Sequence, residues 1–155
     1  MEKDSSFEEF YKNGFPAVFK AALVMAGDRN LAEDATQEAF ARALERWSSM
    51  AEQPWVVGWV MTTALNLVRR AHRRRIRLLP GRDAEERDAD VSLDVWSAIR
   101  SLSRRQQEAV VLHYIGDLPL EQVAKAMACE NGTVKAHLWR ARQQLAKLLG
   151  VREDA

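Results

Sequence analysis

The sequence predicts an all-α fold of two small helical domains joined by an acidic flexible linker, with a helix-turn-helix in the second domain. Apolar residues recur at helical spacing along most of the 155-residue chain. Residues 79–92 instead carry five acids and two arginines around a Pro-Gly pair, which is typical of a linker. Near the end, a short helix, a three-residue turn and a longer helix give the helix-turn-helix layout. We therefore expect a first domain over 1–78, a linker over 79–92 and a second domain over 93–150.

The first domain is expected to contain three helices. Two serines near the start are each followed three residues later by glutamate, the pattern of a capping box, and Pro16 is expected to kink or interrupt that first helix. Asn30 is expected to cap a second helix that runs from Leu31 to about Met50. Residues 48–53 form the predicted loop before the third helix, which runs from Pro54 to Arg77.

The third helix separates into two faces with different chemistry. One side is an ordinary apolar stripe, and the other combines tryptophans with amide, hydroxyl and guanidinium groups: Trp55, Trp59, Thr62, Asn66, Arg70, Arg73 and Arg77. Six arginines fall within residues 69–77, a cluster dense enough to attract phosphate. Arginine binds phosphate, aromatic rings stack on unpaired bases, and Asn and Thr read base edges, so this face predicts nucleic-acid binding. The alternative is that the tryptophans pack under a neighbouring helix while the arginines are solvated.

The second domain is predicted to hold four helices. Ser92 is expected to cap Leu93–Leu102, and Ser103 with Gln106 forms a capping box that opens Arg104–Ile115. The remaining elements are Leu120–Met127, the turn Ala128–Glu130 and a last helix from Asn131 to about Leu149. The 14 residues of the linker would reach ~46 Å if fully extended, so the two domains could sit well apart on one partner.

The last helix has the composition of a recognition helix. Its predicted buried stripe is Val134, Leu138, Ala141, Leu145 and Leu148, and its outward side chains are Lys135, Ala136, Trp139, Arg140 and Gln143, with His137 and Arg142 at the edges. Cations suit phosphate and guanine, an amide suits adenine, and a small residue permits close approach to the major groove. The alternative is a solvated amphipathic helix that closes a small bundle.

Several classes of protein are disfavoured by the same sequence. One cysteine and three scattered histidines give no zinc-ligand spacing, so we expect no metal and no cofactor. Glycine-rich phosphate loops and nucleophile elbows are absent, and we expect no catalysis. A single cysteine excludes an internal disulfide, which fits a reducing cytoplasm, and no apolar run approaches the ~20 residues of a membrane span.

Four stretches together resemble a family. They are Ala32–Phe40, then Trp59-Val60 with Asn66 and the trailing arginines, then Leu102–Gln106, and finally Gly132–Lys135 with Arg140–Arg142 and Leu145. In this order, across nearly the whole chain, they resemble a bacterial RNA polymerase sigma factor of the extracytoplasmic-function (ECF) type. The resemblance implies an alternative-type sigma factor, which binds core polymerase and directs initiation at promoters with −35 and −10 elements.

The resemblance also implies roles for individual residues. Core polymerase, through the clamp helices of its largest subunit, would meet Asp34, Gln37, Glu38 and Arg42. The flap of the second-largest subunit is a further implied contact, and an anti-sigma protein is left open as another partner. Residues 48–53 lie where the family captures a flipped base. The −10 element would meet Trp55, Trp59, Thr62, Asn66, Arg69, Arg70 and Arg73. The −35 element would meet Thr133, Lys135, Ala136, His137, Trp139, Arg140 and Gln143.

Five positions depart from the family pattern, and they bear on base preference rather than on the overall role. They are Arg70, often acidic in the family, and Ala128, Glu130, Asn131 and His137 in and after the turn. A LuxR-type transcriptional regulator is the alternative, because the segment from Thr133 to His137 also fits that recognition helix. That alternative leaves the tryptophan- and arginine-bearing helix of the first domain unexplained.

Overall fold

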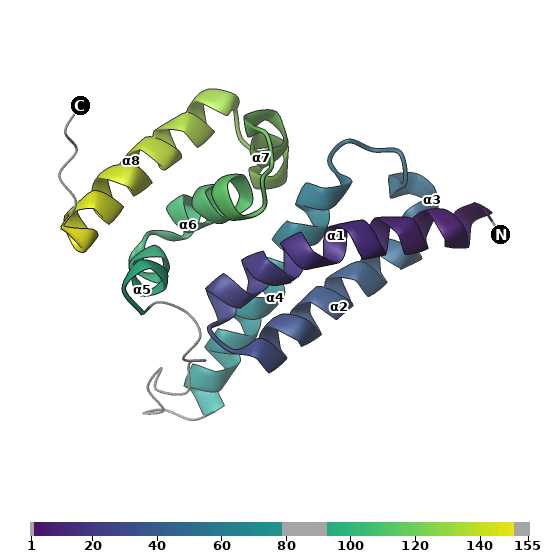
Figure 1. The fold of residues 1–155 in the computed structure, drawn as a ribbon, viewed down its shortest axis with the longest axis horizontal. Coiled ribbons are helices and arrows are strands. Elements are labelled where there is room, and N and C mark those ends of the chain that lie inside the picture. The colour runs from purple at the N-terminus through teal and green to yellow at the C-terminus, as the bar shows by residue number, and fades with distance from the viewer. Residues whose placement is uncertain (1, 79–92, 151–155) are drawn as a thin grey trace.

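The computed structural model describes residues 2–78 and 93–150, in which every regular element is helical. The first helical group contains α1 (Glu2–Ala26), α2 (Arg29–Glu45), α3 (Trp47–Met50) and α4 (Val56–Leu78). The second helical group contains α5 (Leu93–Ser101), α6 (Arg104–Val110), a π-helical turn η2 (Val111–Ile115), α7 (Leu120–Met127) and α8 (Asn131–Leu149) (Figure 1). The all-α prediction is confirmed, while the predicted linker and its Ser92 cap lie outside the described residues.

The first helical group is a three-helix unit in which α1, α2 and α4 pack against one another. Its α2 helix buries four alanines, Ala32, Ala35, Ala39 and Ala43, which recur at helical spacing. Small side chains on this face let the neighbouring helices approach α2 closely. Phe40 fills the remaining space and meets the Tyr11 ring edge-on at 5.0 Å between centroids. This packing leaves the opposite face of α2 in solvent.

The second helical group places α8 across α5, α6 and α7. Val123 and Met127 of α7 and Val134 and Leu138 of α8 are buried, so the short and long helices share one apolar seam. Ala128 has φ 54 and ψ 48, and this left-handed residue ends α7 and turns the chain into α8. The predicted helix-turn-helix and its turn are therefore confirmed.

Several predicted local features are wrong. The first helix begins at Glu2 and continues through Pro16 without interruption. Asn30 does not cap α2; Asp28 does, because its Oδ1 accepts hydrogen bonds from the backbone N–H groups of Asn30 at 2.9 Å and Leu31 at 3.3 Å. Gly27, with φ 66, turns the chain so that Asp28 meets the helix start directly. The helical turn α3 occupies the first part of the predicted 48–53 loop.

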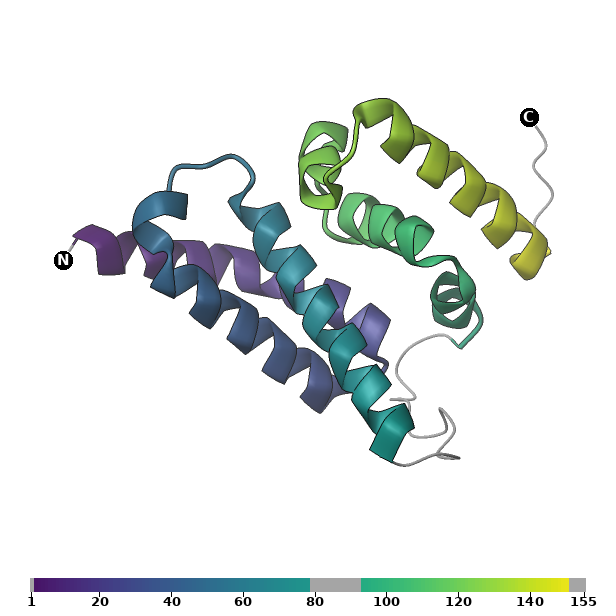
Figure 2. The ribbon, with the colours of Figure 1, turned by 180° about the vertical axis from the view of Figure 1, so that it is seen from behind.

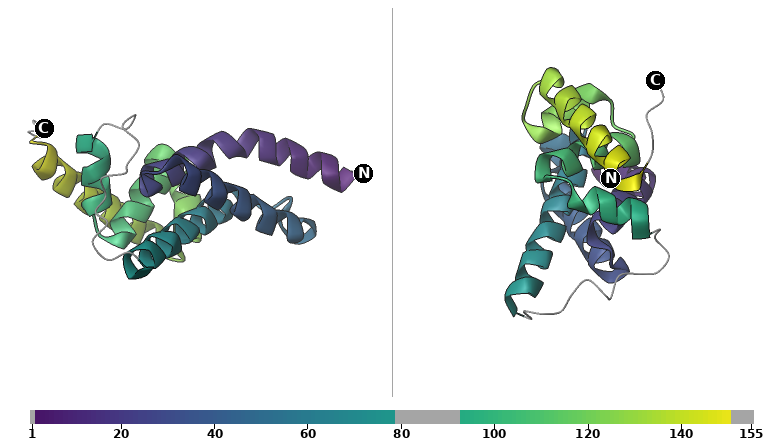
Figure 3. Two further views of the ribbon diagram at one scale, coloured as in Figure 1. Left: turned by 90° about the horizontal axis from the view of Figure 1, so that it is seen from below. Right: turned by 90° about the vertical axis from the view of Figure 1, so that its left-hand side faces the viewer.

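The two helical groups pack together instead of sitting apart. One cluster of buried side chains runs through both groups, and α4 contacts η2 and α7 as well as α1 and α2. In Figure 2, α4 lies between α2 and the second group, and Figure 3 shows the N-terminal half of α1 extending away from that group. A line of positions 58, 61, 65 and 69 on α4 faces the second group, which explains why Leu65 is fully buried.

Candidate nucleic-acid interface

Four of the polar or aromatic side chains predicted on the third helix meet in one pocket. The pocket has a volume of about 400 Å³ and is lined by Trp55, Trp59, Thr62, Thr63 and Asn66 from the first group and by Lys125 and Ala126 from α7. Position 55 precedes the first turn of α4, and positions 59, 62 and 66 follow at helical spacing, so the periodicity alone brings these side chains together. The second helical group supplies the facing wall.

Trp55 and Trp59 are half-buried, so the alternative interpretation, in which the tryptophans pack against neighbouring residues, is partly correct. Both contact a small apolar cluster around Trp47 and Met50, which holds the indole rings in place. The Arg46 guanidinium also lies 5.7 Å from the centroid of the Trp59 ring. The remaining indole surface lines the pocket, where a planar base could stack.

Asn66 and Arg69 are tied to a buried carboxylate from the other helical group. The Glu108 side chain is 7% exposed and its Oε1 lies 3.1 Å from Nη1 of Arg69, which is itself 14% exposed. Arg105 binds the second oxygen, Oε2, at 2.9 Å, and Arg104 approaches Oε1 at 3.4 Å. The Asn66 Oδ1 accepts from Arg69 at 3.2 Å and from Arg104 at 3.4 Å. Burial lowers the pKa of Arg69, although the Glu108 charge opposes that shift.

The rest of the arginine cluster lies at the surface. Arg70 and Arg73 are exposed and available to phosphate. Arg75 is also exposed but binds Asp28, with 2.9 Å between its Nη2 and Oδ2. Burial acts to raise the pKa of Asp28, but the Arg75 bond and the backbone N–H groups outweigh it, so that pKa is lowered. The cluster therefore has three parts. Arg69 is buried against Glu108, Arg75 binds the Asp28 cap of α2, and Arg70 and Arg73 face solvent.

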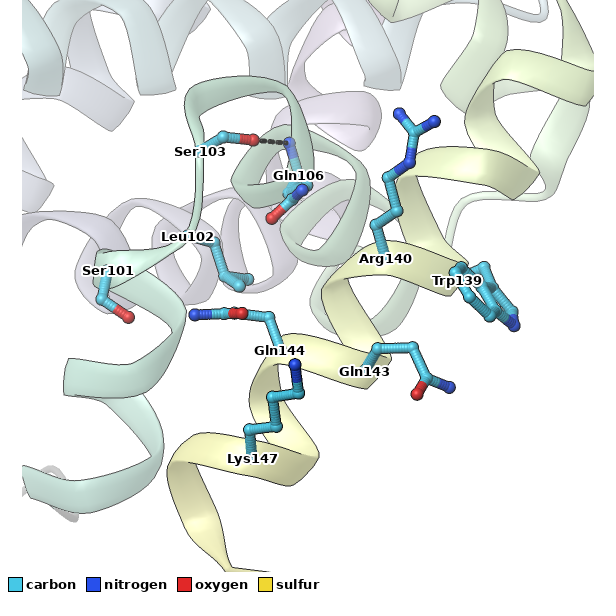
Figure 4. A pocket seen from close by; sticks show the side chains of 9 residues that line it. All are labelled: Ser101, Leu102, Ser103, Gln106, Trp139, Arg140, Gln143, Gln144 and Lys147. Carbon is cyan, nitrogen blue, oxygen red and sulfur yellow. Dashed lines mark hydrogen bonds between the residues drawn. The ribbon is translucent and has the colours of Figure 1, made fainter.

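The predicted recognition helix presents its side chains to solvent. Thr133, Lys135, Ala136, Trp139 and Arg140 are exposed, Trp139 by 59%, whereas His137 and Gln143 are half-buried. A pocket of about 510 Å³ lies between α8 and the α5–α6 connection, and its lining includes Trp139, Arg140, Gln143, Gln144 and Lys147. Figure 4 shows Trp139 and Gln143 pointing away from α5, while Gln144 extends toward it.

His137 lies at the inner edge of this face. Burial and the nearby Arg105 and Arg140 charges lower its pKa, and Glu108 only partly opposes them. The imidazole is therefore neutral near pH 7, where it offers one donor and one acceptor rather than a positive charge. This differs from the arginine that is common in the family at this position.

The side chains predicted to meet core polymerase share one face of α2. Asp34, Gln37 and Glu38 are exposed, and Arg42 is half-buried. Arg42 Nε lies 3.1 Å from Oε1 of Glu38, so the two form an i,i+4 pair. The face is thus a mixed-charge surface with a net excess of acid.

The described residues contain neither a cluster of metal ligands nor a membrane-spanning helix. In residues 2–78 and 93–150, no three His, Cys, Asp or Glu side chains are grouped as metal ligands. In the same part of the chain, no helix has the length and apolarity needed to cross a bilayer.

Comparison with known proteins identifies both helical groups. Residues 10–78 match the family described as Sigma-70 region 2, and residues 92–145 match Sigma-70, region 4. The chain belongs to the sigma-70 family. The first match accounts for the helices that a LuxR-type regulator left unexplained, so that alternative is not favoured. From here we call α1–α4 the region 2 domain and α5–α8 the region 4 domain.

Relatives of this sigma-70 member include sigma factors of the ECF type, which confirms the resemblance. It is 30% identical to the ECF RNA polymerase sigma factor BldN of Streptomyces coelicolor over 93% of this chain and 60% of the relative. It is 28% identical to the ECF sigma factor SigE of Mycolicibacterium smegmatis over 93% of this chain and 62% of the relative. The chain thus spans about three fifths of the length of these two relatives. A crystal structure of the sigma factor RpoE of Bartonella quintana, in complex with the anti-sigma factor NepR, is similar with a TM-score of 0.74, 26% identity, and coverage of 95% of this chain and 98% of that one.

Some residues of these sites are missing from the sequence-based prediction. Glu108 is one, because a carboxylate in a helix is usually solvated and its partner Arg69 lies 39 positions away. Lys125 is another, since it sits on the short helix and reaches the region 2 pocket only through domain packing. Gln144 and Lys147 could have been found, because they follow Arg140 at helical spacing on the same side of α8.

Proposed function

We propose that this sigma-70 member binds core RNA polymerase in the cytoplasm and directs promoter-specific initiation, with no catalysis of its own. One observation carries the proposal. Helices α4 and α8 each have a face that combines tryptophan with cationic side chains and is exposed or lines a pocket. These two faces occur in a chain that matches regions 2 and 4. Each face has the composition that nucleic acid requires, and two faces suit two separate promoter elements.

The α4 face is suited to the −10 element in opened form. Stacking on Trp59 and hydrogen bonding to Asn66 require a base outside the duplex, because both groups lie in a pocket rather than along a groove. Binding of such bases would shift the closed–open equilibrium of the promoter toward the open state. Arg70 and Arg73 at the exposed edge would hold the adjoining phosphates.

The α8 face is suited to the −35 element as intact duplex. Lys135 and Arg140 can bind phosphate or guanine, and Ala136 leaves room for close approach to the groove. The neutral His137 would read bases as a hydrogen-bonding group. Because each domain alone has a small surface, tight promoter binding would require both domains to be held on core polymerase at fixed spacing.

The acidic face of α2 is the proposed contact with the clamp helices of the largest polymerase subunit. Its support is the exposed Asp34, Gln37 and Glu38 on a helix whose opposite side is anchored by alanines. We also propose an anti-sigma protein as a further partner. This proposal is supported by the similar RpoE structure, which was determined with its anti-sigma factor.

Reconstitution with core polymerase tests the function. The purified chain should give promoter-dependent run-off RNA only when core enzyme is added, and transcription by neither the chain nor the mixture would contradict the proposal. Asn66→Ala should lower open-complex formation by about tenfold or more, because a lost base contact costs about 1–3 kcal/mol, while core binding is unchanged. Asn30→Ala removes the same group from an exposed site on α2 and should leave open-complex formation intact. Equal loss of core binding and opening in Asn66→Ala would refute the base-reading role.

A further inference from the structure

Arg105 of α6 contacts the point at which α7 ends and the turn into α8 begins. Its Nη2 donates a hydrogen bond of 2.7 Å to the backbone carbonyl oxygen of Met127, the last residue of α7. Its Nη1 lies 2.9 Å from Oε2 of Glu108, which follows three residues later on α6. One guanidinium group therefore joins a side chain of α6 to the backbone directly before the turn of the helix-turn-helix.

The Met127 carbonyl needs a donor from outside its own helix. The last carbonyls of an α-helix have no intrahelical partner, and a positive charge near them also interacts favourably with the helix dipole. The carbonyls of Ala124 and Lys125 accept from backbone N–H groups in the turn, at 3.0 Å and 3.2 Å. Arg105 supplies the donor for Met127, and because its guanidinium is charged the bond is stronger than a bond between neutral groups.

The shape of the guanidinium group makes this connection directional. Its N–H groups form a rigid planar fork, so it bonds two acceptors only when both lie at the spacing that the fork sets. The Glu108 side chain is 7% exposed, so its carboxylate is confined and serves as a fixed anchor. A lysine ammonium at position 105 would keep the charge but lose the fork, because it is a compact point charge on a flexible stem.

Arg105 also lies close to a side chain on the recognition helix. Helix α6 packs against α8, and the charge of Arg105 acts on the His137 imidazole. Burial is the main cause that lowers the pKa of His137, and the Arg105 charge is the next. Arg140 acts in the same direction from within α8, while Glu108 only partly opposes them. The guanidinium that holds the turn is thus also part of the surroundings of a predicted base-reading residue.

We propose that Arg105 is a positioning residue for the −35 element, because its simultaneous bonds to Glu108 and to the Met127 carbonyl fix the angle at which α8 leaves the turn and meets the bases. This inference rests on the proposed function of the α8 face. Arg105 itself touches no base and no phosphate. The side chains of α8 make those contacts, and Arg105 determines where they lie relative to α6 and α7.

Base discrimination by the reconstituted holoenzyme tests this role. The probe is a promoter duplex that the chain transcribes in the run-off assay, compared with copies that each carry one base change in the −35 element. A wrong base at a well-read position weakens binding about 5- to 150-fold. Arg105→Gln should reduce that ratio to about twofold at one or more −35 positions, because a displaced helix no longer aligns its side chains with the bases. Base changes in the −10 element should keep their full effect.

The ratio of affinities also separates positioning from folding. A variant that only destabilised the chain would lower the active fraction and weaken binding to every duplex equally, which leaves the ratio unchanged. Arg105→Lys should recover only part of the discrimination, because it restores the charge without the fork. Arg104→Gln is the matched control, since Arg104 also approaches Glu108, at 3.4 Å, whereas the bond to Met127 belongs to Arg105. That control should retain the wild-type ratio at every −35 position.

Salt dependence separates positioning from direct contact with DNA. Loss of a phosphate contact in Arg105→Gln would weaken binding to all duplexes equally and reduce the slope of log affinity against log salt by about 0.9. A positioning residue should leave that slope unchanged while the discrimination falls. Equal weakening on all duplexes with the smaller slope would therefore overturn the inference.

His137 provides a readout that needs no DNA. In an NMR titration of the imidazole protons, assigned with a His137→Gln chain, the pKa of His137 should be higher in Arg105→Gln than in the wild type, because a nearby positive charge is gone. An unchanged pKa would show that Arg105 does not lie against α8 as the inference requires, and would overturn it.

The outcomes also separate this inference from the proposed function. If Arg105→Gln keeps the wild-type discrimination at every −35 position, the positioning role is refuted while the sigma function stands. Absence of run-off RNA with the wild-type chain and core polymerase would refute the sigma function, and this inference with it, before any variant is compared.

Discussion

Replacing Ala128 by glycine should stabilise the protein, because this residue joins α7 to α8 in the left-handed region. Its φ of 54 and ψ of 48 place the Cβ against the following carbonyl, which costs about 1–2 kcal/mol for a residue other than glycine. Glycine removes that cost but loses about 0.4–1 kcal/mol through its freer unfolded state. The side chain is exposed, so no packing is lost. The net gain is about 0.5–1 kcal/mol, or about 2 °C in Tm.

Thermal and urea unfolding followed by circular dichroism at 222 nm measure this effect. Ala136→Gly is the matched control, since Ala136 is an exposed alanine inside α8 with helical backbone. There glycine should destabilise by about 1 kcal/mol. The two substitutions are chemically identical, so only backbone conformation distinguishes them. A fall in Tm for Ala128→Gly comparable to that of Ala136→Gly would refute the assignment of strain to the turn.

The other predictions concern core binding, pH and domain packing. Reversing the charges of Asp34 and Glu38 to lysine should weaken association with core polymerase at least tenfold in a pull-down or anisotropy titration, with unchanged circular dichroism. Asp28→Asn should lower the free energy of unfolding near pH 7 by about 1 kcal/mol, since it weakens a helix cap and an ion pair. Because the folded pKa of Asp28 is lowered, its contribution is complete above the unfolded pKa of about 4 and is lost as pH falls through the folded pKa, so urea titrations of the two chains should converge in acid. Gly116→Ala should destabilise by about 1–3 kcal/mol in the same assay, because the new Cβ would lie 2.5 Å from Sδ of Met61.

Each of these three has a control that isolates its cause. Lysines at Glu8 and Glu9 make the same charge change on the exposed part of α1, and an equal loss of core affinity there would assign the effect to net charge alone. A constant difference between Asp28→Asn and wild type down to pH 2 would show that the carboxylate charge is not involved. Gly132→Ala adds a methyl group in open space inside α8, where helix propensity predicts a small gain in stability. A similar gain for Gly116→Ala would show that its new methyl group meets no clash.

Local features of this fold were predictable because their causes lie within a few residues of one another. The turn after Met127 follows from two apolar helical patterns separated by three residues, and the polar face of α4 follows from periodicity alone. The cap of α2 was predicted at Asn30 but lies at Asp28; both residue types cap helices, so residue type alone does not identify the cap. The observed cap lies two residues before the predicted one, directly after Gly27, whose φ of 66 turns the chain at that point.

Long-range features were not predictable by the same means. Glu108 lies in a helical stretch where an acid normally faces solvent, and only the packing of Arg69 from another domain shows that it is buried. Two glycines, Gly58 within a helix and Gly116 before a turn, are weak sequence evidence for the close contact between the domains. Each has an ordinary local explanation, so the close approach becomes visible only when the three-dimensional arrangement is known.

The row of alanines on α2 has a consequence for how this molecule can change. Ala32, Ala35, Ala39 and Ala43 are all fully or nearly fully buried, so one methyl group apiece sets the separation of α2 from its neighbours. The proposed polymerase-binding acids point outward from that same helix, and the proposed promoter-binding side chains point outward from α4. The size of these methyl groups therefore fixes the distance between the proposed polymerase-binding face of α2 and the proposed promoter-binding face of α4. Substitution of any of these alanines by valine or leucine would shift the proposed polymerase-binding face relative to the proposed promoter-binding face, even if the variant still folded.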